Sequence, residues 1–231
     1  MWQSAAAHQL LTCRRHRFIY THHRGPDPLR QLLQLCVHRD PKSPRQRLRQ
    51  LGLLKGEDAL VLRLRELVWS TASSALPFLN DAFLHEAVKA DATCDVFLSS
   101  QVANRASRAQ GQAFLLAAEA TFANEALRSA LPFSHVAVAM GHTLKVERFT
   151  LADARRLFLF GVTRAALSAV VRLGGAGPLR AQRLLFELHP VMDEALEETK
   201  AMTSGDATST APLLDLTQSA HDRLYSRLFQ S

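Results

Sequence analysis

The chain has 231 residues, of which 47% are hydrophobic, enough for one globular domain of about 150–200 residues plus extensions. Its formal net charge of +7 is concentrated in residues 1–55, which carry 11 Lys and Arg but only Asp27 and Asp40, a net +9. The remaining residues hold 17 basic and 19 acidic side chains, a net −2. The main domain is therefore not expected to bind nucleic acid.

The cysteine pattern and the hydropathy indicate in which cellular compartment the protein is expected. Cys13, Cys36 and Cys94 are isolated and form no CxxC pair, which fits a reducing compartment and argues against a disulfide scaffold or a zinc site. No apolar run approaches the roughly 18 residues of a membrane span, so we expect a cytoplasmic protein that makes no use of a membrane. The Arg-rich, acid-poor N-terminus also has the composition of a mitochondrial presequence, whereas a poorly ordered tail is the plainer interpretation.

Helical periodicity begins after the N-terminal extension. Proline-containing stretches within residues 1–55 allow at most a short helix, around residues 28–37. From residue 57 the sequence "GEDALVLRLRELVWS" predicts a helix with four apolar side chains on one face. These side chains are Leu60, Leu64, Leu67 and Val68.

The next segments also predict helices. "LPFLNDAFLHEAVKA" follows, and its Pro77 suits a first helical turn. "CDVFLSS" leads into "NRASRAQGQAFLLAAEA", a helix expected to continue to about Phe122. "LPFSHVAVAMGHTL" predicts a buried helix, although its valines leave a strand possible.

Capping and turn residues define the C-terminal half. "TLADARRLFLFGVTRAALSAVVRL" begins with a capping box, in which Thr150 caps the helix and Asp153 reaches back. Gly174 suits the position just past this helix, and Pro178 suits the start of the next one. The His189–Pro190 pair is expected to kink or interrupt that next helix.

The chain as a whole reads as an all-α protein, because no segment alternates convincingly with period two. We divide it into a basic, poorly ordered extension (1–55), an all-α domain (56–202), and a linker with a partner-binding tail (203–231). The small-polar stretch at 203–210 has the composition of a linker with little to pack. The tail after it carries enough apolar residues to dock, either on its own domain or on a partner.

Chemical motifs are weak. "GGAGP" at 174–178 lacks the Lys-Ser/Thr of a phosphate loop and follows a helix, so it reads as a helix–helix turn. His135 and His142 are seven residues apart, about 10 Å along a helix, which is too far for one metal ion and favours a core or interface role. Ser107 has no acidic residue nearby in the sequence to orient a histidine. We predict no catalytic residue, no metal site and no tightly bound cofactor.

The helix around residues 104–120 is unusual because a glycine lies in its middle. Five residues share one side of this helix: Ala103, Ser107, Gly111, Phe114 and Ala118. All except the phenylalanine are small, so another helix could approach this side closely. A mid-helix glycine costs about 1 kcal/mol relative to alanine, which close packing can offset. Arg105, Arg108 and Gln112 lie on the adjoining face. They form either a solvated basic stripe or the polar rim of a partner-binding surface.

Three segments together resemble the urease accessory protein family UreF. They are "NRASRAQGQAFL", "LSAVVRLGGAGPLRAQRLL" and the terminal "LLDLTQSAHDRLYSRLFQS", and the likeness covers roughly residues 57–231. It implies an all-α, dimeric, non-catalytic adaptor that joins UreD (also called UreH) and the GTPase UreG to deliver nickel to apo-urease, with nickel and GTP handled by these partners. The residues that we expect to contact partners are Arg105, Ser107, Arg108, Gln110, Gly111, Arg172, Asp215, His221, Tyr225, Arg227 and Phe229.

One departure from the family pattern concerns the N-terminal region. The family continues from an apolar "LLQL" into a Pro-x-Gly-Gly stretch and a His-Ser-x-Gly-Leu-Glu box. Here "LLQL" at 32–35 is followed by "CVHRDPKSPRQRLRQLG", and the box is missing. This leaves two alternatives open, namely a degenerate or repurposed UreF-like interaction scaffold and, on the extension alone, a basic helical nucleic-acid binder.

Overall fold

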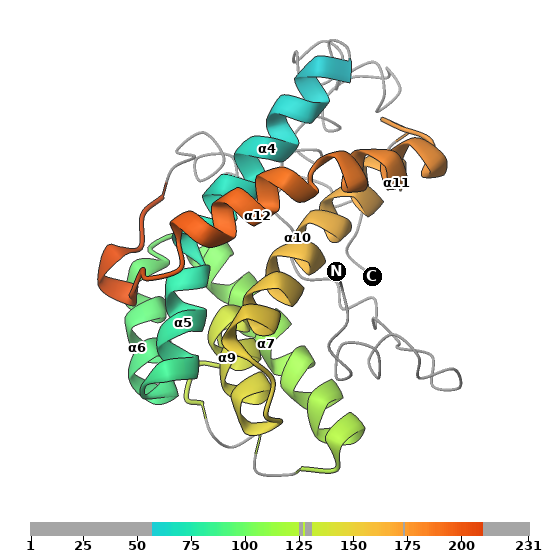
Figure 1. Ribbon diagram of the computed structural model, residues 1–231. Helices are drawn as coiled ribbons and strands as arrows, with labels where there is room; N and C mark the ends of the chain where they lie inside the picture. Colours follow the sequence, from blue (N-terminus) through green and yellow to red (C-terminus); the bar gives the residue numbers. More distant parts are fainter. Residues whose placement is uncertain (1–56, 125–126, 128–130, 173, 210–231) are drawn as a thin grey trace.

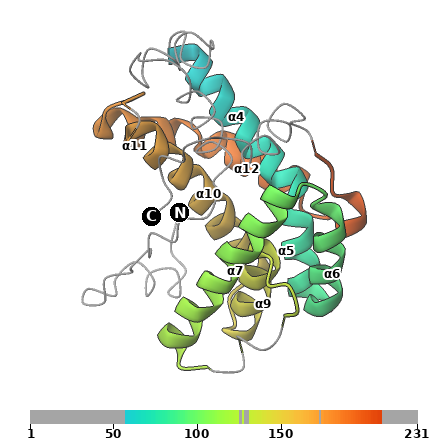
Figure 2. The ribbon, with the colours of Figure 1, turned by 180° about the vertical axis from the view of Figure 1, so that it is seen from behind.

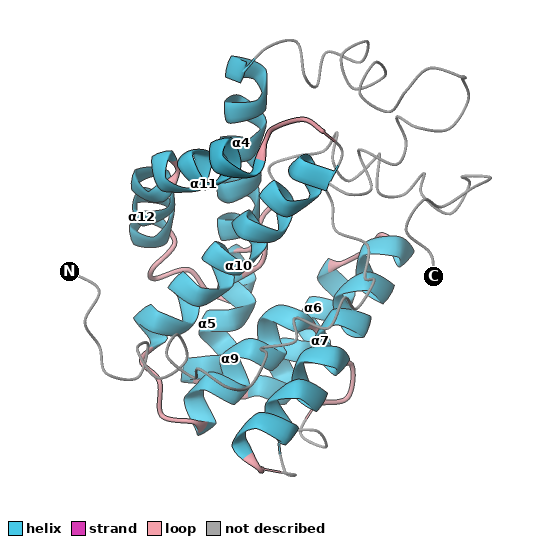
Figure 3. Cartoon of the chain, turned by 90° about the vertical axis from the view of Figure 1, so that its right-hand side faces the viewer, coloured by secondary structure: helices cyan, strands magenta, loops and turns pink. Residues whose placement is uncertain are grey.

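The computed structural model describes residues 57–124, 127, 131–172 and 174–209 (Figure 1). Within these ranges the regular elements are α-helices and one 3-10 helix, and no strand occurs (Figure 3), which confirms the predicted all-α fold class. The basic extension and the apolar tail lie outside the described residues, and so does the short helix expected around residues 28–37.

The described helices form two adjoining groups. Helices α5, α6, α7 and α9 pack together in one group, and α4, α10, α11 and α12 form the other (Figures 1 and 2). Contacts of α10 with α5 and α9, and of α4 with α5, join the two groups around one apolar core. In chain order the elements are α4 (Glu57–Ser74), α5 (Leu76–Leu84), α6 (Ala87–Phe97), α7 (Gln101–Phe122), α9 (Val136–Val146), α10 (Leu151–Arg172), α11 (Pro178–Glu187), α12 (His189–Glu198) and the 3-10 helix η1 (Ser204–Asp206).

The apolar face predicted for α4 is the face that the structure buries, since Leu60, Leu64, Leu67 and Val68 all belong to the core. Pro77 lies in the first turn of α5, as expected. The sequence did not show where the following helices end. α5 stops at Leu84, and α6 and α7 are separate helices.

Helix α9 lies between α5 and α7, so "LPFSHVAVAMGHTL" forms a buried helix rather than a strand from Val136 onward. Its residues Val138 and Ala139 are fully buried. At Gly141 the backbone comes so close to α5 that a Cβ atom would lie 2.6 Å from the carbonyl oxygen of Leu79. Such an approach is open only to glycine.

The local signals around α10 and α11 are confirmed. The Oγ1 atom of Thr150 accepts a hydrogen bond from the backbone N–H of Asp153 at 3.1 Å, which caps α10. Gly174 has φ of +69°, the left-handed conformation expected just past a helix. Pro178 is the first residue of α11, and α12 starts at His189, with Pro190 in its first turn, after an interruption at Leu188. None of the described helices is both long and apolar enough to cross a membrane.

The segment after α12 differs from the expected linker because polar side chains of other helices hold it. Arg155 of α10 is buried and donates to the carbonyl oxygen of Leu196 at 2.7 Å, near the end of α12. The buried Asn80 of α5 donates to the carbonyl oxygen of Met202 at 2.8 Å. Asp81 accepts from the N–H of Ser204 at 2.9 Å. The first two bonds satisfy carbonyl groups in and just after the last turn of α12. The third bond holds Ser204 against α5, and the N–H of Thr208 donates to the carbonyl oxygen of Ser73 on α4 at 3.1 Å.

Candidate partner-binding surface

The buried side of α7 is close to the predicted one but rotated toward neighbouring positions. Gly111 and Ala118 are buried, as expected, whereas Ala103, Ser107 and Phe114 lie at the half-buried edges. The centre of the buried side is completed by Val102, Ala106 and Leu115.

Gly111 is the point of closest approach between α7 and the start of α9. A Cβ atom at Gly111 would lie 1.7 Å from the carbonyl oxygen of Ser134 and 2.9 Å from the carbonyl carbon of His135. The neighbour is therefore backbone rather than the flank of a second helix. Close packing at Gly111 is confirmed, whereas the approach of another helix, predicted from the sequence, is not found at this residue.

A buried carboxylate holds the backbone that Gly111 touches. Asp91 of α6 is fully buried. Its Oδ2 accepts hydrogen bonds from the backbone N–H groups of Phe133 at 2.7 Å and Ser134 at 2.9 Å, and its Oδ1 accepts from that of His135 at 2.9 Å. These residues form the turn that leads into α9, with His135 as its N-cap, so the carboxylate fixes this entry and places a negative charge near the positive end of the helix dipole.

His135 connects three helices through both ring nitrogens. Nε2 lies 3.1 Å from Oδ1 of Asp95 on α6, and Nδ1 lies 3.2 Å from Oγ of Ser107 on α7. An ionised carboxylate can only accept, so Nε2 carries the proton and Ser107 donates its hydroxyl hydrogen to Nδ1. The same Oγ accepts from the backbone N–H of Val136 at 3.4 Å.

This Ser–His–Asp chain has the residue types of a hydrolase triad but not its accessibility. The side chain of His135 is 0% exposed, and the oxygen of Ser107 is engaged with the α9 backbone. A nucleophile needs a substrate within reach, and a general base must pass its proton to that substrate. The arrangement therefore fixes α6, α7 and α9 relative to one another.

Asp95 and Arg108 bring this network to the surface. Asn104 donates to Oδ1 of Asp95 at 2.8 Å, and the guanidinium of Arg108 lies 3.8 Å from the same oxygen. The pKa of Asp95 is lowered, chiefly by the Asn104 hydrogen bond, with His135 and Arg108 adding to the effect against the opposing influence of burial. We call Asp95, Asn104, Ser107, Arg108 and His135 the α7 corner.

The exposed rim of the α7 corner combines charge with an aromatic ring. Arg108 lies over the ring of Phe133, 5.1 Å from its centroid, with 41% of its side chain exposed. Arg105 is exposed on the same helix, and Gln110 is half-buried. A half-exposed arginine held by a carboxylate and an aromatic ring loses little rotamer freedom on binding, which suits a protein interface.

The remaining site candidates lie elsewhere. Arg172 is exposed at the end of α10, beside α11, and donates to the carbonyl oxygen of Ser168 at 3.4 Å. A single chain therefore does not bury it, and its role across a dimer interface stays a prediction. The candidates of the tail lie outside the described residues, namely Asp215, His221, Tyr225, Arg227 and Phe229.

Three residues of the network were missed from the sequence: Asp91, Asp95 and Asn104. The two aspartates are four apart in "DATCD" and so share a helix face, which is a signal of a common role. Their contacts with residues 133–135 join positions 40 or more apart, where spacing gives no indication. Among the described residues, no group of three His, Cys, Asp or Glu side chains is placed to hold a metal ion.

Acidification is expected to destabilise the protein through His135. Burial lowers the pKa of this imidazole below its ordinary value of 6.5, so the unfolded chain binds a proton where the folded chain does not. The free energy of unfolding therefore rises with pH between the lowered pKa and about 6.5, and falls as the pH drops through that window. Urea titrations at pH 5 and pH 7 measure the difference.

The matched variants for this test are His135→Gln and His142→Gln. Burial also lowers the pKa of His142, with Lys145 adding to the effect, so each variant should remove its own part of the acid-induced loss. An unchanged pH dependence in His135→Gln would show that this imidazole stays equally protonated in both states.

Comparison with known proteins identifies the family. The UreF family profile matches residues 55–189, more than half of the chain. The chain belongs to the UreF family. It is 29% identical over 195 residues to urease accessory protein F of Arabidopsis thaliana, covering 79% of this chain and 81% of that protein. To urease accessory protein F of Oryza sativa subsp. indica it is 30% identical over 151 residues, covering 62% of this chain and 58% of that protein.

The start of the UreF match at residue 55 agrees with the sequence pattern, whereas its end at residue 189 lies before the tail that the resemblance included. A further similar protein, the urease accessory protein UreF of Trichodesmium erythraeum, is 28% identical over 144 residues, 58% of this chain and 62% of that protein. The profile match starts two residues before α4, so it includes the whole α7 corner and excludes residues 1–54. The chain spans less than two thirds of the rice and Trichodesmium relatives.

Proposed function

We propose that this chain is a non-catalytic adaptor in urease maturation. It joins a UreD/UreH-like protein and a UreG-like GTPase, and the assembly inserts nickel into apo-urease. The observation that carries the proposal is the UreF profile match over residues 55–189, together with relatives that are named urease accessory proteins.

The α7 corner supports an adaptor because its surface residues are fixed in place. Asp95 and Phe133 hold the guanidinium of Arg108, and the buried His135 holds Asp95. We assign Arg105, Ser107, Arg108, Gln110 and Gly111 to this docking surface. Ser107 and Gly111 support it from below, while the others meet the partner.

In this proposal the chemistry belongs to the partners. Nickel and GTP are handled by the associated proteins, and this chain acts as a homodimer in the cytoplasm. We assign Arg172, exposed at the end of α10, to the dimer interface, where a second copy adds acceptors to the Ser168 carbonyl oxygen that the chain itself provides.

A second candidate is a repurposed UreF-like interaction scaffold. The observation that favours it is that the profile match excludes residues 1–54, where the family box is missing from the sequence. A scaffold of this kind would keep the helical body but bind other proteins than those of urease maturation.

Co-purification separates the two candidates. The tagged full-length chain, co-expressed with the UreD- and UreG-like proteins of its own organism, is expected to retain both through size-exclusion chromatography. Retention of neither by a folded chain would contradict the adaptor function and favour the repurposed scaffold.

Removal of residues 213–231 is expected to abolish capture of the UreD-like protein while the helical body stays folded. The tail carries Leu224, Tyr225, Leu228 and Phe229, which one short helix would gather on a single side. The same loss is expected when these four residues are replaced by serine in the full chain. The control is Gln218→Ser, a polar change in the same segment.

The measurements are helical circular dichroism and the amount of UreD-like protein retained. A folded, truncated chain that still captures the partner would contradict the assignment. Collapse of the whole fold on truncation would instead indicate that the tail docks on its own domain.

A further inference from the structure

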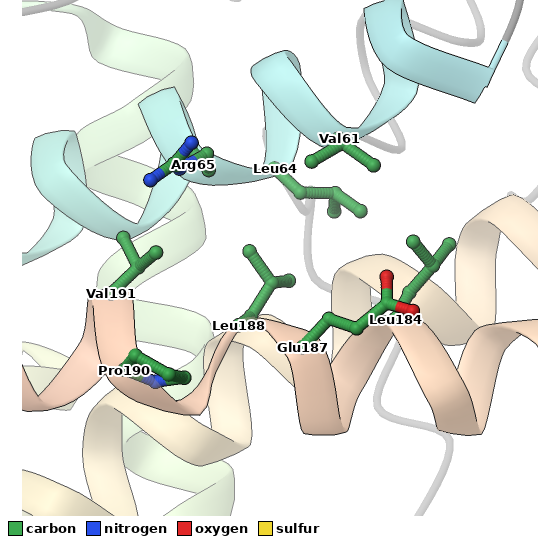
Figure 4. A pocket seen from close by; sticks show the side chains of 8 residues that line it. All are labelled: Val61, Leu64, Arg65, Leu184, Glu187, Leu188, Pro190 and Val191. Atoms are coloured by element: carbon green, nitrogen blue, oxygen red, sulfur yellow. The ribbon is translucent and has the colours of Figure 1, made fainter.

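A small apolar groove lies between α4 and the α11–α12 junction, outside the α7 corner. Its volume is about 200 Å³, below the roughly 300–1,000 Å³ of small-molecule pockets. Leu64, Leu184 and Leu188 form the buried floor, while Val61 and Pro190 lie at the rim (Figure 4). The groove therefore suits a few aliphatic side chains of a peptide segment.

One further apolar side chain of α4 is exposed next to a groove residue in the sequence. Leu62, next to the rim residue Val61, is 55% exposed. Arg65 also belongs to this wall and contributes a positive charge (Figure 4). On the opposite wall Glu187 is engaged by Arg180 at 3.0 Å and by Arg183 at 3.2 Å. Because the groove has one arginine on one wall and a paired glutamate on the other, it does not strongly favour either a cationic or an anionic ligand.

The strong charge lies one turn further along α12. Asp193, Glu194, Glu197 and Glu198 are all exposed at helical spacings that place them on the side continuing from Pro190. Lys200 pairs with Glu197 at 3.1 Å. Among the described residues, Asp193, Glu194 and Glu198 form no ion pair. A segment that lies in the groove and continues along α12 should therefore be basic as well as leucine-rich.

The chain itself contains such a segment, directly before α4. Residues 45–54 read "RQRLRQLGLL", with three arginines, four leucines and no acidic residue. Residues 1–55 as a whole carry a net +9. Residues 45–54 therefore match both the apolar groove and the acidic side of α12, and they directly precede the helix that forms one wall of the groove.

The connection is long enough. From Glu57 to Arg65, α4 advances only about 12 Å, at ~1.5 Å per residue. Ten residues of extended chain span up to about 33 Å, so residues 45–54 can reach both the groove and the acidic side of α12. A tether this short gives a local concentration on the order of millimolar, so weak contacts suffice.

We propose that residues 45–54 bind in cis across this groove, with leucines in the apolar part and arginines against Asp193 and Glu194 of α12. The groove serves an intramolecular contact of the divergent N-terminal region. This contact is separate from the proposed role in urease maturation, and neither depends on the other.

Photo-crosslinking of the full-length chain tests the proposal. Benzoylphenylalanine replaces Pro190 at the rim of the groove, or Leu62 if the first variant does not fold. The matched control site is Leu116 on α7, which is similarly exposed at 51%. We expect cross-links to residues 45–54 at a yield at least tenfold above the control site. Mixing isotope-labelled and unlabelled chains distinguishes links within a chain from links between chains.

Charge reversal tests the electrostatic part. Asp193→Lys with Glu194→Lys should lower the cross-linking yield at least fivefold. Adding Arg47→Glu and Arg49→Glu to the same chain should restore most of it. The control is Glu86→Lys, an exposed acidic residue at the start of α6. Cross-links to residues 210–231, cross-links between chains, or none above the control would each overturn the proposal.

Discussion

Replacing Gly111 by alanine is expected to destabilise the protein by about 3 kcal/mol or more, at the upper end of the usual cost of overpacking. The added methyl group would lie 1.7 Å from the carbonyl oxygen of Ser134. That oxygen belongs to backbone that three hydrogen bonds to Asp91 hold in place, so it cannot move away at little cost. The roughly 1 kcal/mol by which alanine favours a helix over glycine does not offset this clash.

A second glycine provides the matched control. Gly177 has no atom within 4 Å of its hypothetical Cβ, and its φ of −74° suits any residue. Gly177→Ala should therefore change the free energy of unfolding by less than about 1 kcal/mol. Urea denaturation of both variants measures the difference. A Gly111→Ala variant as stable as wild type would show that α9 can shift away from α7.

The sequence predicted those features that are encoded within a few neighbouring residues. The apolar face of α4 follows from a 3.6-residue repeat, and the cap at Thr150 follows from the identity of the residue three positions later. Gly174 and Pro178 mark a turn because one favours a left-handed backbone and the other a first helical turn. Local propensity and tertiary packing agree at these sites, so local rules suffice.

The α7 corner could be predicted only in part. Gly111 was recognisable because a mid-helix glycine requires a reason. The hydrogen-bond network around Asp91 and His135 was not recognisable from the sequence. These two residues are 44 positions apart, and only the packing of α6 against α9 brings them together. For His135 the sequence left a core or an interface role open, and the structure buries it in the core; its partners depend on the tertiary fold.

The anchored segment after α12 shows a different limit. Its small-polar composition is typical of a linker, because such residues bury little apolar surface. In the structure it is held by hydrogen bonds instead, to Asn80 and Asp81 of α5 and to the carbonyl oxygen of Ser73, which accepts from Thr208 at 3.1 Å. Polar composition therefore did not imply a lack of structure.

Replacing Asp91 by alanine should destabilise the protein by roughly 3–5 kcal/mol, because three buried backbone donors lose their acceptor at once. The carboxylate is fully buried and accepts from three successive backbone N–H groups. Each buried donor left without a partner costs about 1–3 kcal/mol, and water can replace only part of the loss. Asp91→Asn should lie in between, because its one carbonyl oxygen can serve only some of the donors.

The control is Asp58→Ala, an exposed carboxylate in the first turn of α4, which should cost about 0.3–1 kcal/mol. Hydrogen exchange at residues 133–135 provides the specific readout, since these amides should lose protection in Asp91→Ala at denaturant concentrations where the rest of the helices stay protected. Because Phe133 is the ring beneath Arg108, loosening this segment should also release the guanidinium. Partner capture should then weaken even in the fraction that remains folded. Unchanged exchange at these three amides would show that the carboxylate does not hold the start of α9.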